Sequence, residues 1–553
     1  MAAGRPFRWE KSYPPGLRWD VEIPRKTLGA LLAESVAAHG ERPALLYRDT
    51  TLSYAALGDL ALRAGAGFAA MPEARDGVAL FLPNSPYHSI AFFGCASAGL
   101  RVVQLSPLDA PRELAHKLRD SGARVLVTLA MPPLLAAAEK LRGAGLVDRL
   151  VVADDARWGA GPDSAPLPSG AVPFDALLAG APLGPRAIDA DAVALLQYTG
   201  GTTGLPKGAM LSHANLTAAA FQMSYWASAR PLDGDAPTRA ILVLPLFHIF
   251  ALTTMVRYLA GGRTVLLRQR FDASQCLDDI ERFRPDTMAG VPTMWIALAN
   301  HPEIEKRDLS SLRYPASGGA PLPIEVEARF ARLFGRRLRG GWGMTETAPA
   351  GTSHPVIGES KEGSVGLPMP GIEIEIVALD DPRRVLGPNE TGELRVRGPN
   401  VMRGYWNKDE ENARAFVDGF FLTGDIGRMD EDGFVFLTDR KKDMILSGGY
   451  NVYPRVIEEA IYEHPDVEEC VVLGVPDAYR GQSAKAFVKL RAGSAPLTLE
   501  ALQEFLKERV GRHEMPATLE LRESLPRTAV GKLSKLMLLE EERQRAAASA
   551  ATA

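Results

Sequence analysis

Strand-like and helix-like segments alternate through the first part of the chain. GVALFLPNS (77–85) reads as a strand, and the helical PYHSIAFFGCASAG (86–99) follows it. The strand-like TVLLRQRF likewise precedes a helix that we expect to begin at Asp272 and to end before Pro285. Such alternation is typical of parallel sheets covered by helices. The sequence therefore predicts an α/β fold for this large region.

The pattern of strand-like and helix-like segments changes twice after this region. From about Gly371, short alternating runs such as IEIEIVAL stand close together with little helix between them, which indicates a smaller β-rich subdomain. The charged stretch TDRKKD (438–443) then marks a boundary, and an α+β unit of about a hundred residues follows, a normal domain size. For the 553-residue chain we expect an N-terminal domain over residues 1–438 and a C-terminal domain over 439–553.

Bulk composition limits the class of protein and its location. A net charge of −4 gives no indication of a nucleic-acid partner. Cys95, Cys276 and Cys470 lie far apart without metal-ligand spacing, as expected for reduced thiols in a cytoplasmic protein. The most apolar run, residues 240–256, is short for a membrane span and contains Pro245. We expect no transmembrane segment, and peripheral association with a membrane surface stays an open alternative.

One stretch, QYTGGTTGLPKGAML (197–211), concentrates glycine and threonine around Lys207. The apolar run before it predicts a strand, and the segment after it begins with a serine cap signal and predicts a helix. A loop between the two can surround a polyanion with N–H groups, hydroxyl groups and one positive charge. It is no Walker A loop, because Pro206 precedes the lysine and Gly208 follows it. The candidate phosphate-binding residues are Thr199, Gly200, Gly201, Thr202, Thr203, Gly204 and Lys207.

Four further stretches combine glycines, which leave the backbone accessible to a ligand, with functional side chains. ASGGAPLP (316–323) offers backbone to a flat ligand, and GWGMTETA (341–348) brings an aromatic face, a hydroxyl and a carboxylate together. FLTGDIG places Asp425 after a tight turn, and PRTAVGKLSK, near the C-terminus, places Lys532 after a glycine. Taken alone, the aspartate would be an ordinary turn residue and the lysine a solvated surface residue.

Together and in this order, the five stretches resemble the adenylate-forming superfamily, which comprises acyl-CoA synthetases, luciferases and the adenylation domains of peptide synthetases. The resemblance runs from about Ala44 to Lys535, nearly the whole chain. It implies a large N-terminal domain of βα-layered sheets with a β-rich subdomain, and a small mobile α+β C-terminal domain. It also implies ATP and CoA as substrates and Mg²⁺ as the metal ion.

The resemblance implies a role for residues of each stretch. The loop ending at Lys207 would hold the β- and γ-phosphates, Thr345 would meet the α-phosphate, and Lys532 would reach the α-phosphate and the acid. Glu346 would help to hold Mg²⁺ between phosphate oxygens. Trp342 would stack on adenine, where most relatives carry tyrosine. The other nucleotide-binding residues implied are Gly318, Gly319, Ala320 and Pro321 at the adenine, Gly341 and Gly343 beside Trp342, and Asp425 and Arg440 at the ribose.

The implied reaction fits these residue types. A carboxylate that attacks a phosphate brings two anions together, so catalysis must screen charge and hold the atoms in line, which a lysine and a metal ion can do. The acyl-AMP then passes to the thiol of CoA. By resemblance, Lys442 is the hinge of the C-terminal domain, Gly449 lies on the CoA side, and Lys532 is similar to a lysine modified by bacterial protein acetyltransferases.

The sequence constrains the identity of the carboxylic-acid substrate less than it constrains the nucleotide site. FDAS (271–274) looks like the motif with which peptide synthetases bind an amino group, but it follows a different strand from the one that carries that motif. The segment at the matching position is FHIF, which has no acidic residue to bind an ammonium group. An amino-acid substrate is therefore disfavoured. Long stretches around the motifs resemble bacterial fatty-acid–CoA ligases, so we expect a medium- to long-chain fatty acid. The residues expected at the acyl pocket are His248, Phe250, Val291 and Met294.

Several alternatives stay open. Dicarboxylic acids such as pimelate, and aryl acids, are the runner-up substrates, because pocket depth depends on packing. A catalytically silent nucleotide-binding relative is disfavoured by the presence of Glu346 and Lys532, and a luciferase-like oxidative enzyme by the similarity to bacterial ligases. A buried structural histidine explains His248 as well as an acyl-site role does, and a homodimer stays open.

Overall fold

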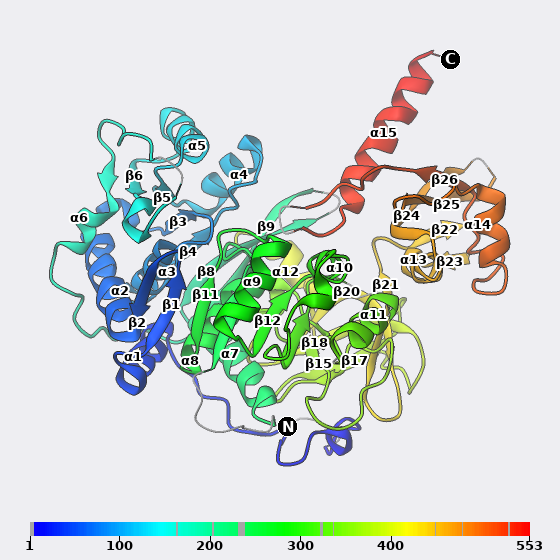
Figure 1. Cartoon of the computed structure of the whole chain (residues 1–553), viewed down its shortest axis with the longest axis horizontal. Coiled ribbons are helices and arrows are strands. Elements are labelled where there is room, and N and C mark those ends of the chain that lie inside the picture. The colour runs from blue at the N-terminus through cyan, green and yellow to red at the C-terminus, as the bar shows by residue number, and fades with distance from the viewer. Residues whose placement is uncertain are drawn as a thin grey trace.

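The computed structural model describes residues 5–161, 164–201, 204–229, 238–320, 324–335, 337–447, 450–477, 479–528 and 531–552. The molecule contains two large sheets with their helices, a β-rich region and a small C-terminal unit (Figure 1). This arrangement confirms the α/β fold class expected from the sequence. Within the described ranges, no helix has the length and apolar character that a membrane span requires.

The first large sheet has the order β7-β6-β5-β3-β4-β8-β9, with β9 antiparallel to β8 and the other pairs parallel. Helix α3 is buried along its whole length, and its approach to α2 depends on glycine: a Cβ on Gly65 would lie 2.5 Å from the carbonyl oxygen of Gly94. The strands are β3 (Val78–Phe81), β4 (Val102–Gln104), β5 (Val125–Leu129), β6 (Arg149–Ala153), β7 (Val172–Pro173), β8 (Val193–Gly201) and β9 (Gly204–Ser212). The helices are α2 (Tyr54–Ala69), α3 (Pro86–Ala98), α4 (Pro111–Ser121), α5 (Pro132–Gly143) and α6 (Phe174–Leu178).

The second large sheet has the order β13-β12-β10-β11-β1-β2 and is parallel except for the β1–β2 hairpin. Its strands are β1 (Pro43–Tyr47), β2 (Thr50–Ser53), β10 (Arg239–Leu242), β11 (Thr264–Leu267), β12 (Thr287–Gly290) and β13 (Tyr314–Ser317). The neighbouring helices are α1 (Leu28–His39), α7 (His213–Ala227), α8 (Ile249–Ala260), α9 (Ala273–Phe283), α10 (Pro292–Ala299) and α11 (Ile324–Phe334). Helix α9 begins after its N-cap Asp272 and ends before Pro285, as predicted.

The parallel arrangement of this sheet decides where three sequence motifs meet. Strands β10, β12 and β13 are neighbours, and the segments LPLFH, VPT and GGA follow their carboxyl ends. Parallel neighbours end at the same edge of a sheet, where α/β proteins place their ligands. The acyl and adenine motifs, which are distant in sequence, therefore share one edge.

The β-rich region and the C-terminal unit contain smaller sheets. Three short strands are β14 (Gly341–Trp342), β15 (Thr352–Ser353) and β16 (Leu367–Pro368). The next sheet contains β17 (Glu373–Val377), β18 (Gly392–Arg397), β19 (Phe416–Val417), β20 (Phe420–Met429) and β21 (Val435–Arg440), with α12 (Asp409–Ala415) beside it. The C-terminal unit contains β22 (Ile445–Ser447), β23 (Tyr450–Val452), β24 (Val467–Asp477), β25 (Gly481–Leu490) and β26 (Thr518–Leu521), and the helices α13 (Pro454–Tyr462), α14 (Leu499–Leu506) and α15 (Lys535–Thr552).

The glycine- and threonine-rich stretch differs from the expected strand–loop–helix arrangement. Residues after the glycines form a second strand, β9, which pairs antiparallel with β8, and Thr199 lies opposite Lys207. Helix α7 begins only after β9, at the predicted cap Ser212. The expectation was wrong because Met210 and Leu211 complete an edge strand with apolar side chains before the helix starts. The stretch is thus the end of a hairpin.

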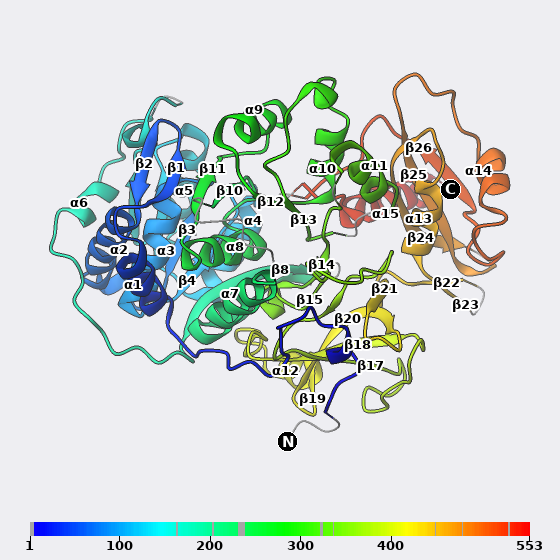
Figure 2. The ribbon, with the colours of Figure 1, turned by 60° about the horizontal axis from the view of Figure 1, so that its bottom comes forward.

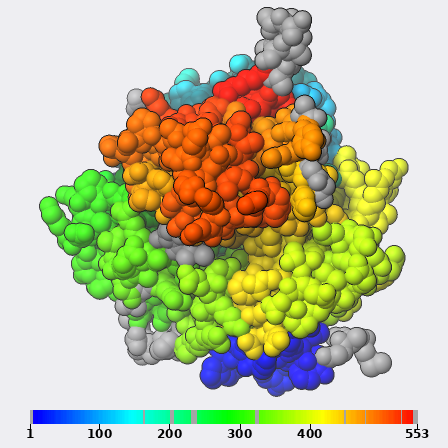
Figure 3. Space-filling model, turned by 90° about the vertical axis from the view of Figure 1, so that its right-hand side faces the viewer, coloured from blue at the N-terminus to red at the C-terminus, as the bar shows by residue number. Residues whose placement is uncertain are grey.

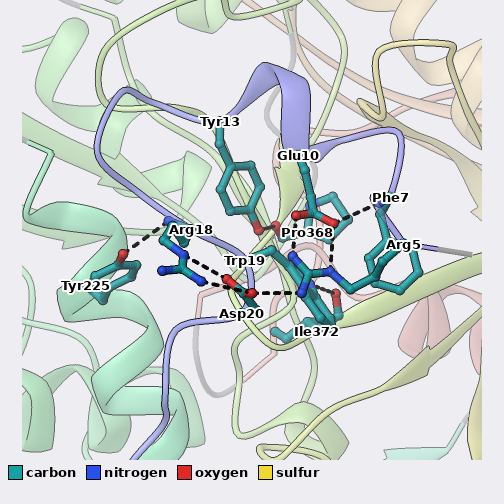
Figure 4. Close-up of polar contacts among 10 residues, drawn as sticks. All are labelled: Arg5, Phe7, Glu10, Tyr13, Arg18, Trp19, Asp20, Tyr225, Pro368 and Ile372. Atoms are coloured by element: carbon teal, nitrogen blue, oxygen red, sulfur yellow. Dashed lines mark hydrogen bonds and ion pairs between the residues drawn. The ribbon is translucent and has the colours of Figure 1, made fainter. Parts of the chain in front are cut away.

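The segment before α1 packs across the β-rich region. Figure 4 shows the Tyr13 hydroxyl donating to the carbonyl oxygen of Pro368 at 2.5 Å and the Trp19 indole donating to that of Ile372 at 2.9 Å. Tyr13 also meets the ring of Trp226 edge-on, with 5.0 Å between the ring centroids. Since Trp226 lines the main cavity, this segment packs against one of the cavity walls.

The C-terminal unit lies over the rest of the molecule on one side, as the turned ribbon and the space-filling view show (Figures 2 and 3). Strand β21 ends at Arg440, slightly past the expected boundary between residues 438 and 439, and the first strand of the C-terminal sheet begins at Ile445. The hydroxyl of Thr293, at the start of α10, donates to the carbonyl oxygen of Gly531 at 3.0 Å. This bond joins the Lys532 loop to the N-terminal part of the chain.

Candidate functional site

The five glycine-rich or charged stretches meet around one large cavity of about 1660 Å³. Its walls come from the β8–β9 hairpin, the segments after β10 and β13, the region from β14 to β15, strands β20 and β21, and the loop before α15. The nucleotide-site residues that line it are Thr199, Lys207, Gly318, Gly319, Gly341, Trp342, Gly343, Thr345, Glu346, Arg440 and Lys532. Asp425 contacts two of these residues from the adjoining strand. Thr202, Thr203, Pro321 and Gly449 lie outside the described residues.

At the hairpin, Lys207 already has an anionic neighbour. Its ammonium forms a 2.6 Å ion pair with Glu411 of α12 and lies 5.3 Å from the centre of the Tyr405 ring. The backbone of Gly200, Gly201 and Gly204 lies in the same hairpin. A triphosphate could replace the Glu411 carboxylate as the partner of this lysine, since phosphate and carboxylate oxygens accept the same hydrogen bonds.

Glu346 lies in a short 3₁₀ helix, Thr345–Thr347, and is buried. The Tyr405 hydroxyl donates to its Oε1 at 2.8 Å. Burial raises the pKa of Glu346, and the bond from Tyr405 opposes that shift. In the described chain no group of three or more His, Cys, Asp or Glu side chains could hold a metal ion by itself. One hard carboxylate fits Mg²⁺ only if phosphate oxygens and water supply its other ligands.

Trp342, Asp425 and Arg440 form a connected group on one side of the cavity. The Trp342 indole N–H donates to Asp425 Oδ2 at 2.7 Å, and Arg440 Nε lies 3.0 Å from Asp425 Oδ1. Asp425 is buried and faces Arg440 across β20 and β21. Both carboxylate oxygens are therefore oriented before any ligand arrives. The tryptophan supplies an N–H that a tyrosine at this place would not supply.

Two glycines beside Trp342 are required by close backbone contacts. A Cβ on Gly343 would lie 1.6 Å from the carbonyl oxygen of Pro349, and one on Gly341 would lie 2.5 Å from that of Thr352. A side chain at either position would therefore displace the segment that carries the indole ring.

Lys532 extends into the cavity from the loop of the C-terminal unit. A Cβ on Gly319 would lie 3.2 Å from Lys532 Nζ, so a larger residue there would crowd the ammonium group. Burial, with the positive charge of Arg440, lowers the pKa of Lys532 to about 8. Ala320 follows Gly319 and is half-buried. The lysine remains charged near neutral pH and lies beside the adenine motif.

His248 lies at the start of α8 and lines the same cavity. Its Nδ1 accepts the backbone N–H of Phe250 at 3.2 Å, which leaves the ring proton on Nε2. Burial and the charge on Lys532 lower the pKa of His248 to about 3. The histidine is therefore neutral near pH 7 and offers one N–H donor.

The expected acyl-pocket residues divide into two groups. His248 and Phe250 line the cavity, and a Cβ on Gly318 would lie 2.9 Å from Cζ of Phe250. Val291 and Met294 are buried near the start of α10 but are not among the described residues on the cavity wall. Lining residues that the sequence reasoning missed include Trp226, Arg257, Arg339, Tyr405 and Glu411. An i, i+4, i+7 count from Phe250 along α8 could have found Arg257.

Lys442 lies in the connector between β21 and β22, is exposed, and lines the edge of the cavity. The backbone N–H groups of its neighbours Lys441 and Asp443 donate to Gly424 and Arg440, at 2.8 and 2.9 Å. In the described chain the Lys442 N–H has no such backbone acceptor. This residue can therefore change its backbone dihedrals without breaking a hydrogen bond of its own.

Comparison with known sequences decides the family. The profile described as AMP-binding enzyme matches residues 32–406, and that of the AMP-binding enzyme C-terminal domain matches residues 456–532. The chain belongs to the AMP-binding enzyme family. The resemblance to adenylate-forming enzymes found in the sequence is thereby confirmed.

Curated relatives of this AMP-binding enzyme are similar over nearly its full length. A long-chain-fatty-acid–CoA ligase of Bacillus subtilis (strain 168) is 36% identical, over 97% of this chain and 98% of that protein. One from Escherichia coli O157:H7 is 34% identical over the same shares. A feruloyl-CoA synthase of Amycolatopsis sp is 37% identical, over 89% of this chain and 94% of that protein.

Solved structures share the fold. An anthranilate CoA ligase in complex with anthranoyl-AMP has a TM-score of 0.83 at 25% identity, covering 96% of this chain and 100% of that one. The o-succinylbenzoate CoA synthetase of Bacillus subtilis, in complex with its acyl-adenylate, has a TM-score of 0.75 at 31% identity, covering 92% and 97%.

Replacing Trp342 by phenylalanine should weaken ATP binding while leaving most of the ring surface in place. Without the N–H donor, one oxygen of the buried Asp425 loses its hydrogen-bond partner. Because a hydrogen bond to a charged group is worth about 1.5 kcal/mol or more, we expect its loss to raise the KM for ATP about tenfold. Steady-state kinetics with varied ATP measures this change. Trp226→Phe is the matched control, because that indole donates to a neutral carbonyl, His354 O, and should leave the KM for ATP unchanged. Equal effects of the two variants would contradict the assignment.

Proposed function

We propose that the protein is an AMP-forming acid–thiol ligase, which activates a carboxylic acid with ATP to acyl-AMP and transfers the acyl group to CoA. The observation that carries this proposal is the meeting of Lys532, His248 and the glycine-rich hairpin at one cavity. Near full-length similarity to curated acyl-CoA ligases supports the same reaction.

A medium- to long-chain aliphatic acid is the substrate class that the relatives favour. The long-chain-fatty-acid–CoA ligases match nearly the whole chain, and the segment FHIF, which enters the cavity, has no acidic residue to hold an ammonium group. A dicarboxylic acid or an aryl acid is the second candidate, since feruloyl-CoA synthase and anthranilate CoA ligase are also similar.

In the first half-reaction a carboxylate oxygen of the acid bonds to the α-phosphorus of ATP, and the bond to pyrophosphate breaks. Lys532 is placed to screen the repulsion between the two anions, and the neutral His248 to orient the acid through its Nε2–H. Thr345 would donate to the α-phosphate. Lys207, released from Glu411, would hold the terminal phosphates.

The remaining nucleotide contacts follow from the connected group around Asp425. That carboxylate would accept from the ribose hydroxyls, Trp342 would cover the adenine, and Arg440 would hold the carboxylate in place. Glu346 would hold Mg²⁺ together with phosphate oxygens. The ion would neutralise negative charge on the departing pyrophosphate.

In the second half-reaction the CoA sulfur attacks the acyl carbonyl carbon and AMP leaves. Lys532 lines the cavity in this structure, so the C-terminal unit, residues 439–553, would rotate about Lys442 to admit the thiol and bring Gly449 to the CoA side. The unconstrained N–H of Lys442 supports this choice of hinge.

The products test the proposed function directly. ATP should be converted to AMP and pyrophosphate only when a carboxylic acid is present, and CoA should then be consumed in equal amount. Chromatography of the nucleotides and a coupled pyrophosphate assay measure both. Release of ADP and phosphate would instead place the protein among kinases or ATPases.

The charge on Lys532 should set an upper pH limit for adenylation. Because the pKa of this lysine is lowered to about 8, its positive charge is present at pH 7 and is lost as the pH rises through 8. We expect kcat/KM for pyrophosphate release to fall about tenfold per pH unit above that value. Lys532→Arg, whose guanidinium remains charged, should not show this decline.

The same residue allows the two half-reactions to be separated. Lys532→Gln should lower adenylation by about 100-fold or more but spare thioester formation from supplied acyl-AMP. Acetylation of Lys532 by a protein acetyltransferase would remove the same charge and have the same effect. Adenylation by Lys532→Gln at the wild-type rate would contradict the role given to this lysine.

Lys442→Pro should separate the half-reactions in the opposite direction. Proline fixes φ and restricts the residue before it, so the connector could not change its dihedrals. Acyl-AMP should still form, because Lys532 already lies in the cavity, and thioester formation should fall steeply. Lys442→Ala, which keeps backbone freedom, is the control. Stopped-flow measurement of each step checks both variants, and equal loss of the two steps in the proline variant would place the hinge elsewhere.

A further inference from the structure

One face of α8 carries a charge into the cavity. Phe250, Thr254 and Arg257 follow one another at i, i+4 and i+7, so they share a face of the helix. Phe250 and Arg257 both line the cavity. At about 1.5 Å per residue, Arg257 lies about 13 Å along the helix from His248. The acyl side of the cavity thus has a cation well beyond the end where the acid would react.

The guanidinium of Arg257 has no anionic partner in the part of the chain that the structure describes: no ion pair or side-chain hydrogen bond joins it to any of those residues. The carboxylate of Asp286 acts electrostatically on Arg257, but it already accepts hydrogen bonds from both terminal nitrogens of Arg263. Burial lowers the pKa of Arg257, which reflects a charge withdrawn from water without compensation.

A second arginine, Arg339, also lines the cavity, and its guanidinium carbon lies 5.9 Å from the centre of the Tyr314 ring. Arg339 reaches it from beside β13, where its backbone bridges to Ala316. Its Nη1 is buried and has no hydrogen-bond partner among the described residues, and the same holds for Oγ of Ser317 on the cavity wall. The cavity wall therefore presents several polar groups without partners among the described residues.

Several other arginines with little solvent exposure are paired with carboxylates. Arg263 contacts Asp286, Arg268 contacts Asp279 through two nitrogens, and Arg395 contacts Glu375. A buried charge without a partner is costly, so an acceptor placed at the guanidinium of Arg257 or at Nη1 of Arg339 would be favourable. Each could bind an acceptor delivered by the substrate.

The chemistry of that acceptor follows from the groups that line the cavity. Lys532 and His248 are expected at the reacting end, the side chains of Met223, Trp226 and Phe250 offer apolar surface, and Arg257 lines the same cavity. A saturated hydrocarbon end would be buried against a bare cation. A carboxylate would accept hydrogen bonds from a guanidinium, in the planar geometry that favours this pair.

We propose that the acid is an α,ω-dicarboxylic acid, whose second carboxylate binds to Arg257, with Arg339 supplying a further guanidinium on the cavity wall. This inference rests on the proposed ligase function and narrows its substrate class. The methylene chain between the carboxylates lies along the apolar surface, and the carboxylate at the other end undergoes adenylation.

The test compares α,ω-diacids with monoacids of the same carbon number, with pyrophosphate release measured over a series of lengths. The wild-type enzyme should show at least tenfold higher kcat/KM for the best diacid than for its matched monoacid. Arg257→Met should lower the diacid value by at least tenfold and leave the monoacid value equal or higher. Arg257→Lys, which keeps a cation, should retain part of the preference, and Arg339→Met should reduce it.

Arg282→Met is the matched control, because it makes the same change at an exposed arginine that is not among the residues lining the cavity, and it should leave the diacid preference in place. Monoacid turnover by Arg257→Met shows that the variant is folded. A wild-type preference for monoacids or aryl acids, or equal loss of both substrates in Arg257→Met, would overturn this inference and leave the ligase function intact. If the enzyme released no pyrophosphate from ATP with any acid of the series, the ligase function and the inference would both be overturned.

Discussion

The buried carboxylate of Asp425 connects the nucleotide side of this protein to its C-terminal unit. One oxygen accepts from the Trp342 indole and the other faces Arg440, so three strands, β14, β20 and β21, are joined at one point. Arg440 is the last residue of β21, directly before the connector. Its charge also contributes to the lowered pKa of Lys532. A change at this carboxylate would therefore affect the adenine side, the hinge and the lysine together.

The charges around the cavity follow a pattern with functional meaning. The cation expected at the triphosphate, Lys207, is held by Glu411, and the buried Glu346 accepts from Tyr405. These contacts orient the side chains of Lys207 and Glu346 in advance, which reduces the reorganisation that binding requires. Arg257 has no such partner among the described residues. The protein itself supplies partners for Lys207 and Glu346, whereas Arg257 would gain its partner from the proposed diacid substrate.

The sequence predicted the fold class and several helix starts because both depend on local signals. Strand–helix alternation, the caps at Asp272 and Ser212, and the glycine-rich stretches are all read within a few residues. The hairpin formed by β8 and β9 was missed, since antiparallel pairing is decided between strands. Val291 and Met294 were expected at the pocket; they are buried and are not among the described residues that line the cavity, and their role at the acid stays a prediction.

By itself, the sequence determined the family, the order of the motifs and the presence of each charged group that the reaction needs. These are properties of residue type and spacing. Only the tertiary structure decided which of those charges are paired. Glu411 meets Lys207, Trp342 donates to Asp425, and Arg257 enters the acyl side of the cavity without a partner among the described residues. The physical reason is that an ion pair or a buried donor depends on distances of a few ångströms between segments far apart in the chain, and packing sets those distances.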